Sequence, residues 1–255
     1  MPNFQITTIA PITHTAFSEA DTGNITTFRR LPMLHEGMIY NVPVISGNAV
    51  RGLVRRALTT ELVRRYNLKT KLDKLFDKWY VACANGGMLG KELDVAVRTE
   101  KLRQLRQMFP MISVLGSSLY RYMLPGVCNV GFWIPRCTEL GNGEVSLDEI
   151  VCDVSMTHLF DRTVATVDGI KPMPYIVETM IPGVVLDGSV SFAPQATDVE
   201  IACVYHGLRL ISAVGGKQAA GYGVVQIDGL GDDAAYLDWL AQDQSEAMLS
   251  FAEDL

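Results

Sequence analysis

A glycine-rich segment near the end of the chain is the first place where the residues suggest chemistry. Residues 215–223 read Gly-Gly-Lys-Gln-Ala-Ala-Gly-Tyr-Gly, with four glycines among nine residues. Glycine lets the backbone approach a ligand closely, and successive exposed amides in such a loop can form an anion-binding concavity. Because Lys217 lies in the same segment, the pattern indicates phosphate binding. The segment lacks the Gly-Lys-Ser/Thr ending of a P-loop, which disfavours an NTPase.

A second anion-binding pattern lies far upstream. An extended Val-Pro-Val-Ile stretch leads into Ser46, Gly47 and Asn48, which are good N-cap chemistry, and an apolar stripe typical of a helix follows. Arg51 and Arg55 are four residues apart and share one face of that helix. A helix N-terminus carries free amides and a partial positive charge, so it favours an anion.

These two segments together carry a family resemblance. Residues 46–55 resemble the Pro-Gly-Ser-Ser-Leu-Lys-Gly-x-x-Arg signature of the CRISPR-associated RAMP superfamily, and residues 215–223 resemble that superfamily's C-terminal glycine-rich loop. Val114-Leu115-Gly116-Ser117 resembles its Leu-Phe-Gly-Ser element. Asp161-Arg162-Thr163, with the apolar stretch from Tyr175, resembles the hairpin of its backbone subunits. The four landmarks occur in the family's order, and the compact length looks most like the type IV backbone subunit.

The resemblance implies which residues meet RNA. The expected RNA-binding residues are Arg29, Arg30, Ser46, Asn48, Arg51, Arg55, Gly215, Gly216, Lys217, Gln218 and Tyr222. The residues expected in a protruding hairpin, the family's thumb, are Asp161, Arg162, Thr163 and Val164.

The distribution of charge agrees with a polyanion ligand. The chain has a net charge of −6, yet residues 29–106 hold 16 basic and 7 acidic residues. Residues 228–255 hold eight acidic residues and no basic one. Such asymmetry suggests one basic surface offset elsewhere, although a solvated helical face explains residues 61–78 equally well.

The elements that must position these residues follow a βαββαβ order, which predicts an α+β, ferredoxin-like core similar to an RNA-recognition module. Strands are expected at 3–13, 127–136, near 150, and at 175–181, 188–193 and 222–229. Helices are expected at 48–66, 69–82, 94–108, 198–212 and 233–253, and residues 17–44 are expected to form a loop. We expect one domain over residues 1–255, with a helical insertion at about 67–125 and the thumb hairpin at about 157–180.

Other site classes find little support. Four dispersed histidines and five scattered cysteines without a Cys-x-x-Cys pair disfavour a metal site, so no metal and no cofactor are expected. No apolar run is long enough to predict a membrane span, and the pattern of the first residues does not predict a signal peptide. The cysteine pattern fits a reduced, cytoplasmic protein.

The leading hypothesis is a non-catalytic subunit that binds CRISPR guide RNA (crRNA) along its phosphates. The resemblance implies repeated copies in a head-to-tail helical filament, with other effector subunits and a complementary target as partners, and displacement of target-pairing bases at intervals. Residues 24–32 hold no carboxylate, whereas target-cutting type III subunits place an aspartate there, and metal-assisted cleavage needs such a group.

Two alternatives stay open. The first is an RNA-cleaving enzyme of the same superfamily, either a target-cutting type III backbone subunit or a guide-processing endoribonuclease. The second is a structural assembly protein that binds no RNA.

Overall fold

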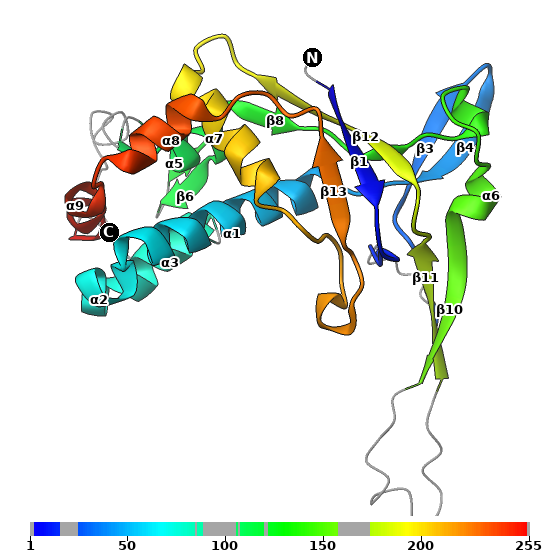
Figure 1. Ribbon diagram of the computed structural model, residues 1–255, viewed down its shortest axis with the longest axis horizontal. Coiled ribbons are helices and arrows are strands. Elements are labelled where there is room, and N and C mark those ends of the chain that lie inside the picture. Colours follow the sequence, from blue (N-terminus) through cyan, green and yellow to red (C-terminus); the bar gives the residue numbers. More distant parts are fainter. Residues whose placement is uncertain are drawn as a thin grey trace, which may run out of the picture.

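The computed structural model describes residues 3–15, 25–84, 86–88, 106, 108–119, 122–157 and 174–253. Within these ranges helices and mainly antiparallel sheets form an elongated molecule, with most helices at one end and two β-hairpins at the other (Figure 1). The predicted α+β class is confirmed.

The central sheet joins strands from both ends of the chain. Its order is β13 (Val225–Asp228), β1 (Asn3–Thr8), β12 (Val185–Phe192) and β8 (Cys128–Val130), with β9 (Ile134–Pro135) also paired to β12. Every pairing is antiparallel. Phe4 and Ile6 of β1 are buried and Gln5 between them is exposed, so one face of the sheet packs on the core.

Two long helices run side by side against this core, α1 (Gly47–Tyr66) and α7 (Asp198–Arg209) (Figure 1). Ser46 caps α1, accepting a hydrogen bond from the Ala49 amide at 3.3 Å, and Thr197 with Glu200 forms a capping box on α7. Gly207 lets the helices approach closely, since a Cβ there would lie 2.7 Å from Val54 Cγ1.

Shorter elements extend the helical side of the molecule. The helices are α2 (Leu68–Leu72), α3 (Phe76–Ala84), α5 (Pro110–Leu115), α6 (Leu147–Ile150), α8 (Ala234–Ala241) and α9 (Ser245–Glu253), with 3-10 turns η1 (Asp73–Leu75), η2 (Thr138–Leu140) and η3 (Gln218–Ala220). A small sheet joins β5 (Gly87–Met88), β6 (Ser117–Leu119) and β7 (Tyr122–Leu124). Buried aromatic residues hold this side together, including Trp79 and the Phe109–Phe251 ring pair with centroids 4.9 Å apart.

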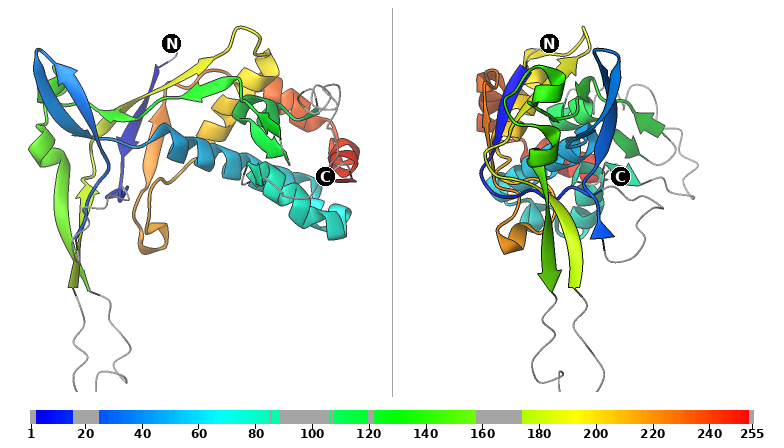
Figure 2. Two further views of the ribbon diagram at one scale, coloured as in Figure 1. Left: turned by 180° about the vertical axis from the view of Figure 1, so that it is seen from behind. Right: turned by 90° about the vertical axis from the view of Figure 1, so that its right-hand side faces the viewer.

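Two hairpins project from the opposite end (Figures 1 and 2). One is formed by β10 (Val151–Thr157) and β11 (Pro174–Met180), whose antiparallel register runs from Val151–Met180 to Thr157–Pro174. The short strand β2 (Ile25–Thr26) pairs parallel to β11. The other hairpin is formed by β3 (Arg30–His35) and β4 (Met38–Pro43).

The second hairpin corrects a sequence prediction, because residues 17–44 were expected to form a loop. Residues 30–35 alternate between exposed and half-buried positions, as strand residues do. The turn uses Glu36 and Gly37, both with positive φ (47° and 82°), which is the two-residue geometry that suits hairpins. Glutamate is uncommon at a position with positive φ, so the sequence did not indicate a turn here.

Most other elements lie close to their predicted places. The helix expected at 48–66 is confirmed as α1, and the strands expected near 150 and at 175–181 are confirmed as β10 and β11. The helix expected at 69–82 is interrupted, because Asp73 takes a positive φ of 43° between α2 and α3. The expected strand 3–13 ends at Thr8, and the expected helix 94–108 lies almost wholly outside the described residues.

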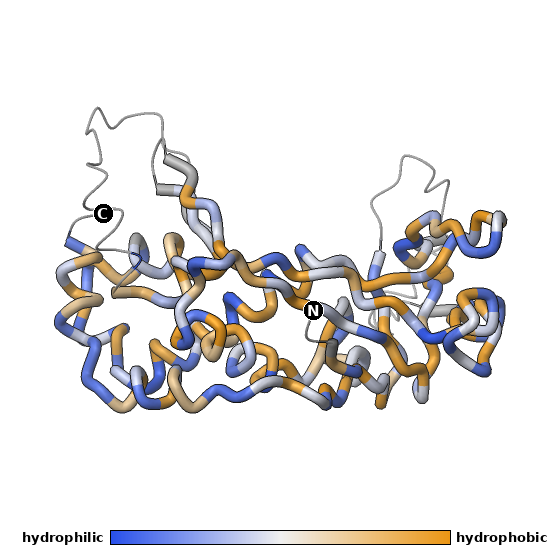
Figure 3. Tube along the Cα trace, turned by 90° about the horizontal axis from the view of Figure 1, so that it is seen from above, coloured by the Kyte–Doolittle hydropathy of each residue, from blue (hydrophilic) through white to orange (hydrophobic). Residues whose placement is uncertain are grey.

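The described trace shows no membrane-spanning helix. Hydrophobic residues are interrupted by hydrophilic ones along the whole of it (Figure 3). Over the ranges given above, no helix is both long and apolar enough to cross a bilayer.

Candidate nucleic-acid interface

One groove follows helix α1 and the glycine-rich segment. It consists of three adjoining hollows of about 910, 440 and 310 Å³, and all three share Gly215. We call it the α1 groove. Its two ends are lined by Arg64 and Arg65 near the end of α1 and by Thr26 and Val177 at the base of the β10–β11 hairpin. The groove therefore connects the helical side of the molecule with the projecting hairpin.

The floor of the α1 groove is one face of α1. Asn48, Gly52, Arg56, Thr60 and Arg64 follow one another at intervals of four residues, which places them in one row along the helix. The neighbouring row also lines the groove and consists of Leu53, Ala57, Glu61 and Arg65. The buried row Val50, Val54, Leu58 and Leu62 points the other way, into the core. The amphipathic pattern of α1 thus fixes which side chains reach the groove.

The charge of the groove is strongly positive. Its lining contains Arg56, Arg64, Arg65 and Lys217, and Glu61 is its single carboxylate among the described lining residues. The three arginines are exposed. In a chain with a net charge of −6, this excess of cations on one concave surface suits a phosphate backbone.

The opposite wall is the glycine-rich segment predicted from the sequence, and Gly215, Lys217 and Gln218 line the groove there. Gly215 has a φ of +80°, and a Cβ on it would collide with the Thr13 carbonyl oxygen. The Gly216 amide donates to that same oxygen at 2.9 Å, and the Gln218 side chain donates to the Gly215 carbonyl at 3.1 Å. These glycines therefore shape the wall of the groove through packing and backbone conformation.

Several amides of the glycine-rich segment, which were expected to form an anion-binding concavity, donate hydrogen bonds within the segment instead. The amides of Ala220, Gly221 and Tyr222 donate to carbonyls of Lys217 and Gln218 within the segment. Tyr222 itself is half-buried beyond the η3 turn. What the segment presents to the groove is thus mainly Lys217 and the Gln218 side chain.

The N-terminus of α1 meets the groove at its centre, where Asn48 is exposed and His14 lies alongside. His14 Nε2 accepts a hydrogen bond from the Ser46 amide at 3.2 Å, so this nitrogen carries no proton and the imidazole is neutral. Burial, and secondly the nearby Arg29 guanidinium, lower the pKa of His14 and favour this neutral form. Ser46 is therefore occupied as a helix cap, and Asn48 is the exposed polar group of this turn.

Arg51 and Arg55 do not line the α1 groove. Arg55 is buried, with 8% of its surface exposed, and donates to the Gly116 and Leu115 carbonyls at 2.9 and 3.0 Å. Arg51 also donates to the Leu115 carbonyl. Two sequence landmarks, residues 46–55 and 114–117, are thus joined by these arginines, whose guanidinium groups satisfy carbonyls at the end of α5.

Arg29 and Arg30 lie near the hairpins. Arg30 pairs with Glu178 of β11 through two hydrogen bonds of 2.6 and 3.0 Å, and Glu178 also accepts from the Phe28 amide at 2.6 Å. Arg29 joins the backbone of this region, since its amide donates to the His14 carbonyl at 2.8 Å. The four predicted thumb residues, 161–164, lie outside the described residues.

Arg56, Arg64, Arg65 and His14 line the groove but were not predicted from the sequence. A signal for the first two was available, because residues 48, 52, 56, 60 and 64 form a polar or small row at helical spacing next to the apolar one. Arg51 and Arg55 were predicted instead because they share one helix face near the N-terminus of α1 and lie in the segment that resembles the family signature.

Comparison with known proteins gives the fold a context. A chain of a solved type IV-B CRISPR complex aligns with a TM-score of 0.59 and 20% sequence identity, covering 88% of each chain. The chain has the fold of that CRISPR complex protein. The resemblance predicted from the sequence is confirmed for the fold.

Two further structures align more loosely. A chain of the type III-B Cmr-beta complex bound to cognate target RNA has a TM-score of 0.48 at 13% identity, covering 88% of this chain and 57% of that one. Csc2 from Thermofilum pendens has a TM-score of 0.44 at 17% identity, covering 99% and 75%. No family model and no curated protein matches the sequence.

Proposed function

We propose that this protein binds guide RNA along its phosphate backbone in the α1 groove, as a repeated subunit of a class 1 CRISPR effector complex. The observation that carries the proposal is the groove itself, with four cations and one carboxylate in its described lining on the fold of a type IV-B CRISPR complex protein. Contacts from arginine and lysine to phosphate hold a strand without reading its sequence, which is left to base pairing.

The topology supports the RNA-binding fold predicted from the sequence. If β8 with β9, β12 and β13 are counted as the second, third and fourth core strands after β1, the sheet order is fourth, first, third, second. Helices α1 and α7 then occupy the two helix positions of the βαββαβ unit. We infer a ferredoxin-like core, with the β10–β11 hairpin as the base of the thumb.

We propose that copies associate head to tail and that the thumb displaces bases of the guide–target duplex at intervals. The projecting hairpins offer surfaces for a second copy (Figure 2). Leu34 and Ile39 lie opposite each other on β3 and β4 and are 73% and 72% exposed, and exposed apolar side chains gathered in this way mark interaction sites. A head-to-tail contact that does not close on itself produces a helical filament.

We also propose that the protein does not cleave RNA, since residues 24–32 hold no carboxylate and metal-assisted cleavage needs one close to the scissile phosphate. The competing function is that of a superfamily nuclease. Incubation of labelled guide and target RNA with the protein, with and without magnesium, separates the two: RNA that stays intact in both conditions supports the binding subunit, and cleavage product in either condition would establish the nuclease.

The test of RNA binding is the dependence of affinity on salt. For single-stranded RNA, log affinity should fall linearly with log salt, by about 0.7 for each phosphate contacted. Arg56→Gln and Arg64→Gln should each reduce that slope by about 0.7 and weaken all sequences equally. Lys69→Gln, which removes an exposed charge outside the groove, is the matched control and should leave the slope unchanged. No affinity for RNA at low salt, or equal effects of all three variants, would contradict the proposal.

A further inference from the structure

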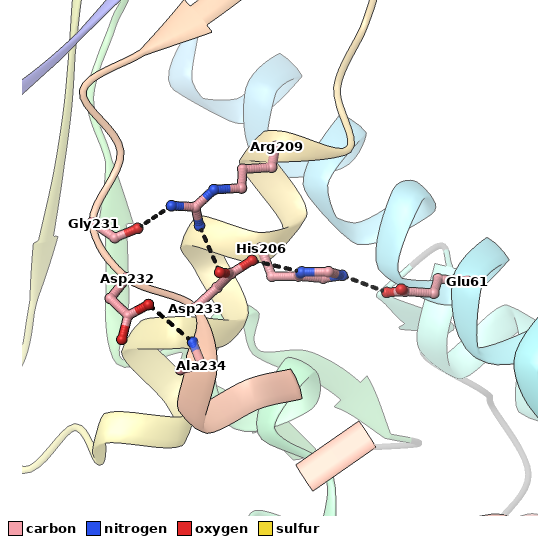
Figure 4. Close-up of polar contacts among 7 residues, drawn as sticks. All are labelled: Glu61, His206, Arg209, Gly231, Asp232, Asp233 and Ala234. Carbon is pink, nitrogen blue, oxygen red and sulfur yellow. Dashed lines mark hydrogen bonds and ion pairs between the residues drawn. The ribbon is translucent and has the colours of Figure 1, made fainter. Parts of the chain in front are cut away.

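Behind the α1 groove, a histidine joins three elements of the fold (Figure 4). His206 of α7 is 8% exposed, and its two ring nitrogens each face a carboxylate. Nε2 lies 2.9 Å from Glu61 Oε2 on α1, and Nδ1 lies 2.9 Å from Asp233 Oδ2, just before α8. Glu61 is the same carboxylate that lines the groove.

The geometry requires a charged histidine. A carboxylate accepts hydrogen bonds, so both ring nitrogens must donate, and only the imidazolium carries a proton on each. The hydrogen bond to Glu61, followed by the one to Asp233, raises the pKa of His206 although burial opposes the shift. The imidazolium is therefore the stable form at pH values where an ordinary histidine is already neutral.

The remaining charges around His206 balance one another. Arg209 lies 3.2 Å from Asp233 and also donates to the Gly231 carbonyl at 2.5 Å, as Figure 4 shows. The Tyr236 ring packs against the imidazole with centroids 5.3 Å apart. Since Arg209 offsets Asp233, the positive charge of His206 is available to offset Glu61.

We propose that His206 is a positioning residue of the RNA site: as an imidazolium it holds Glu61 and neutralises it, so that the groove presents only its cations to phosphate. This inference rests on the proposed RNA-binding function. Without the proton on His206, Glu61 would either repel a phosphate or pair with Arg65, four residues along the same helix. Either outcome removes one effective positive charge from the groove.

Protonation of His206 should increase the affinity of the groove for RNA. RNA affinity should be highest while His206 is protonated and should fall, by roughly two- to tenfold at low salt, as pH rises through the raised pKa of His206. His14, which lines the groove itself, has a lowered pKa and titrates on the acid side of this change. The two histidines can therefore be distinguished by the pH at which affinity changes.

The experiment measures the affinity of the full chain for a fluorescein-labelled single-stranded RNA at constant low salt, from about pH 6 to pH 9. The variants are Glu61→Gln, His206→Gln and the double variant. Glu61→Gln should bind at least as tightly as the low-pH wild type and show no fall with pH. His206→Gln should bind weakly at every pH, and the double variant should regain affinity, which a merely structural role of His206 would not produce.

The outcomes separate the two proposals. Wild-type affinity that does not change with pH, or a fall with pH that persists in Glu61→Gln, would overturn the role of His206. Should His206→Gln fail to fold, Glu61→Gln alone decides, because it retains an acceptor for His206 and lacks only the charge. A wild-type protein that binds no RNA at any pH would instead refute the proposed function itself.

Discussion

Gly52 offers the sharpest test of where RNA lies, because this glycine stands in the second turn of α1 without a packing reason. A Cβ built on it meets nothing within 4 Å, and the residue lines the α1 groove. Glycine in a helix interior costs about 1 kcal/mol relative to alanine. Under the proposed function, the RNA backbone approaches α1 closely at this residue, where a side chain would stand in its way.

Gly52→Ala should therefore make the protein more stable and a poorer RNA binder. The free energy of unfolding should rise by about 1 kcal/mol, which for a chain of this length corresponds to an increase of about 2–4 °C in Tm. The added methyl group should push the RNA strand away from Arg56, which is the next residue in the row along α1 that lines the groove. Loss of one charge-assisted hydrogen bond, worth about 1.5–3 kcal/mol, would lower RNA affinity by roughly tenfold or more.

Thermal unfolding and RNA binding are measured on the same preparations. Ser250→Ala is the matched control, because Ser250 is exposed in the helix α9, outside the groove, and gains helix propensity in the same way. It should raise Tm slightly and leave RNA affinity unchanged. If Gly52→Ala gains stability and keeps wild-type affinity, RNA does not approach α1 at this residue and the reasoning fails.

Three further predictions concern stability. Arg55→Ala should lower the free energy of unfolding by about 2–3 kcal/mol in urea, because the Leu115 and Gly116 carbonyls lose a buried donor; an unchanged midpoint would show that the contact is dispensable. Gly215→Ala should lower Tm, since its positive φ and a backbone collision both oppose a side chain, and a wild-type melting curve would contradict this. The stabilisation by His206 should be complete below its unfolded pKa of about 6.5 and disappear as pH rises through the raised folded pKa; His206→Gln should remove that pH dependence, and identical pH profiles would refute it.

The sequence predicted much of the fold because its strongest signals are local. Ser46 and the Thr197–Glu200 pair mark the starts of α1 and α7 by satisfying helix amides, and the apolar stripe of α1 identifies its buried face. The β3–β4 hairpin was missed since its turn begins with Glu36, a residue that seldom takes a positive φ.

The candidate site was predicted only in part, because the decisive information is not local. The rows that contain Arg51 and Arg56 are adjacent on one helix, and their spacing in the sequence is equivalent. What distinguishes them is a distant segment, residues 115–116, which covers the first row and leaves the second beside the groove. The Glu61–His206 contact likewise joins residues far apart in the chain, so no local sequence motif could predict it.

The Arg30–Glu178 pair has a mechanical consequence. It fastens β3 to β11 where both hairpins leave the body, although the two residues are 148 positions apart in the chain. Strand β4 then continues into α1 through residues 44–46 alone. A displacement of the β10–β11 hairpin by a neighbouring molecule would be transmitted to the start of α1 with little slack to absorb it. Contact at the projecting end and the proposed binding of RNA along α1 would then be coupled.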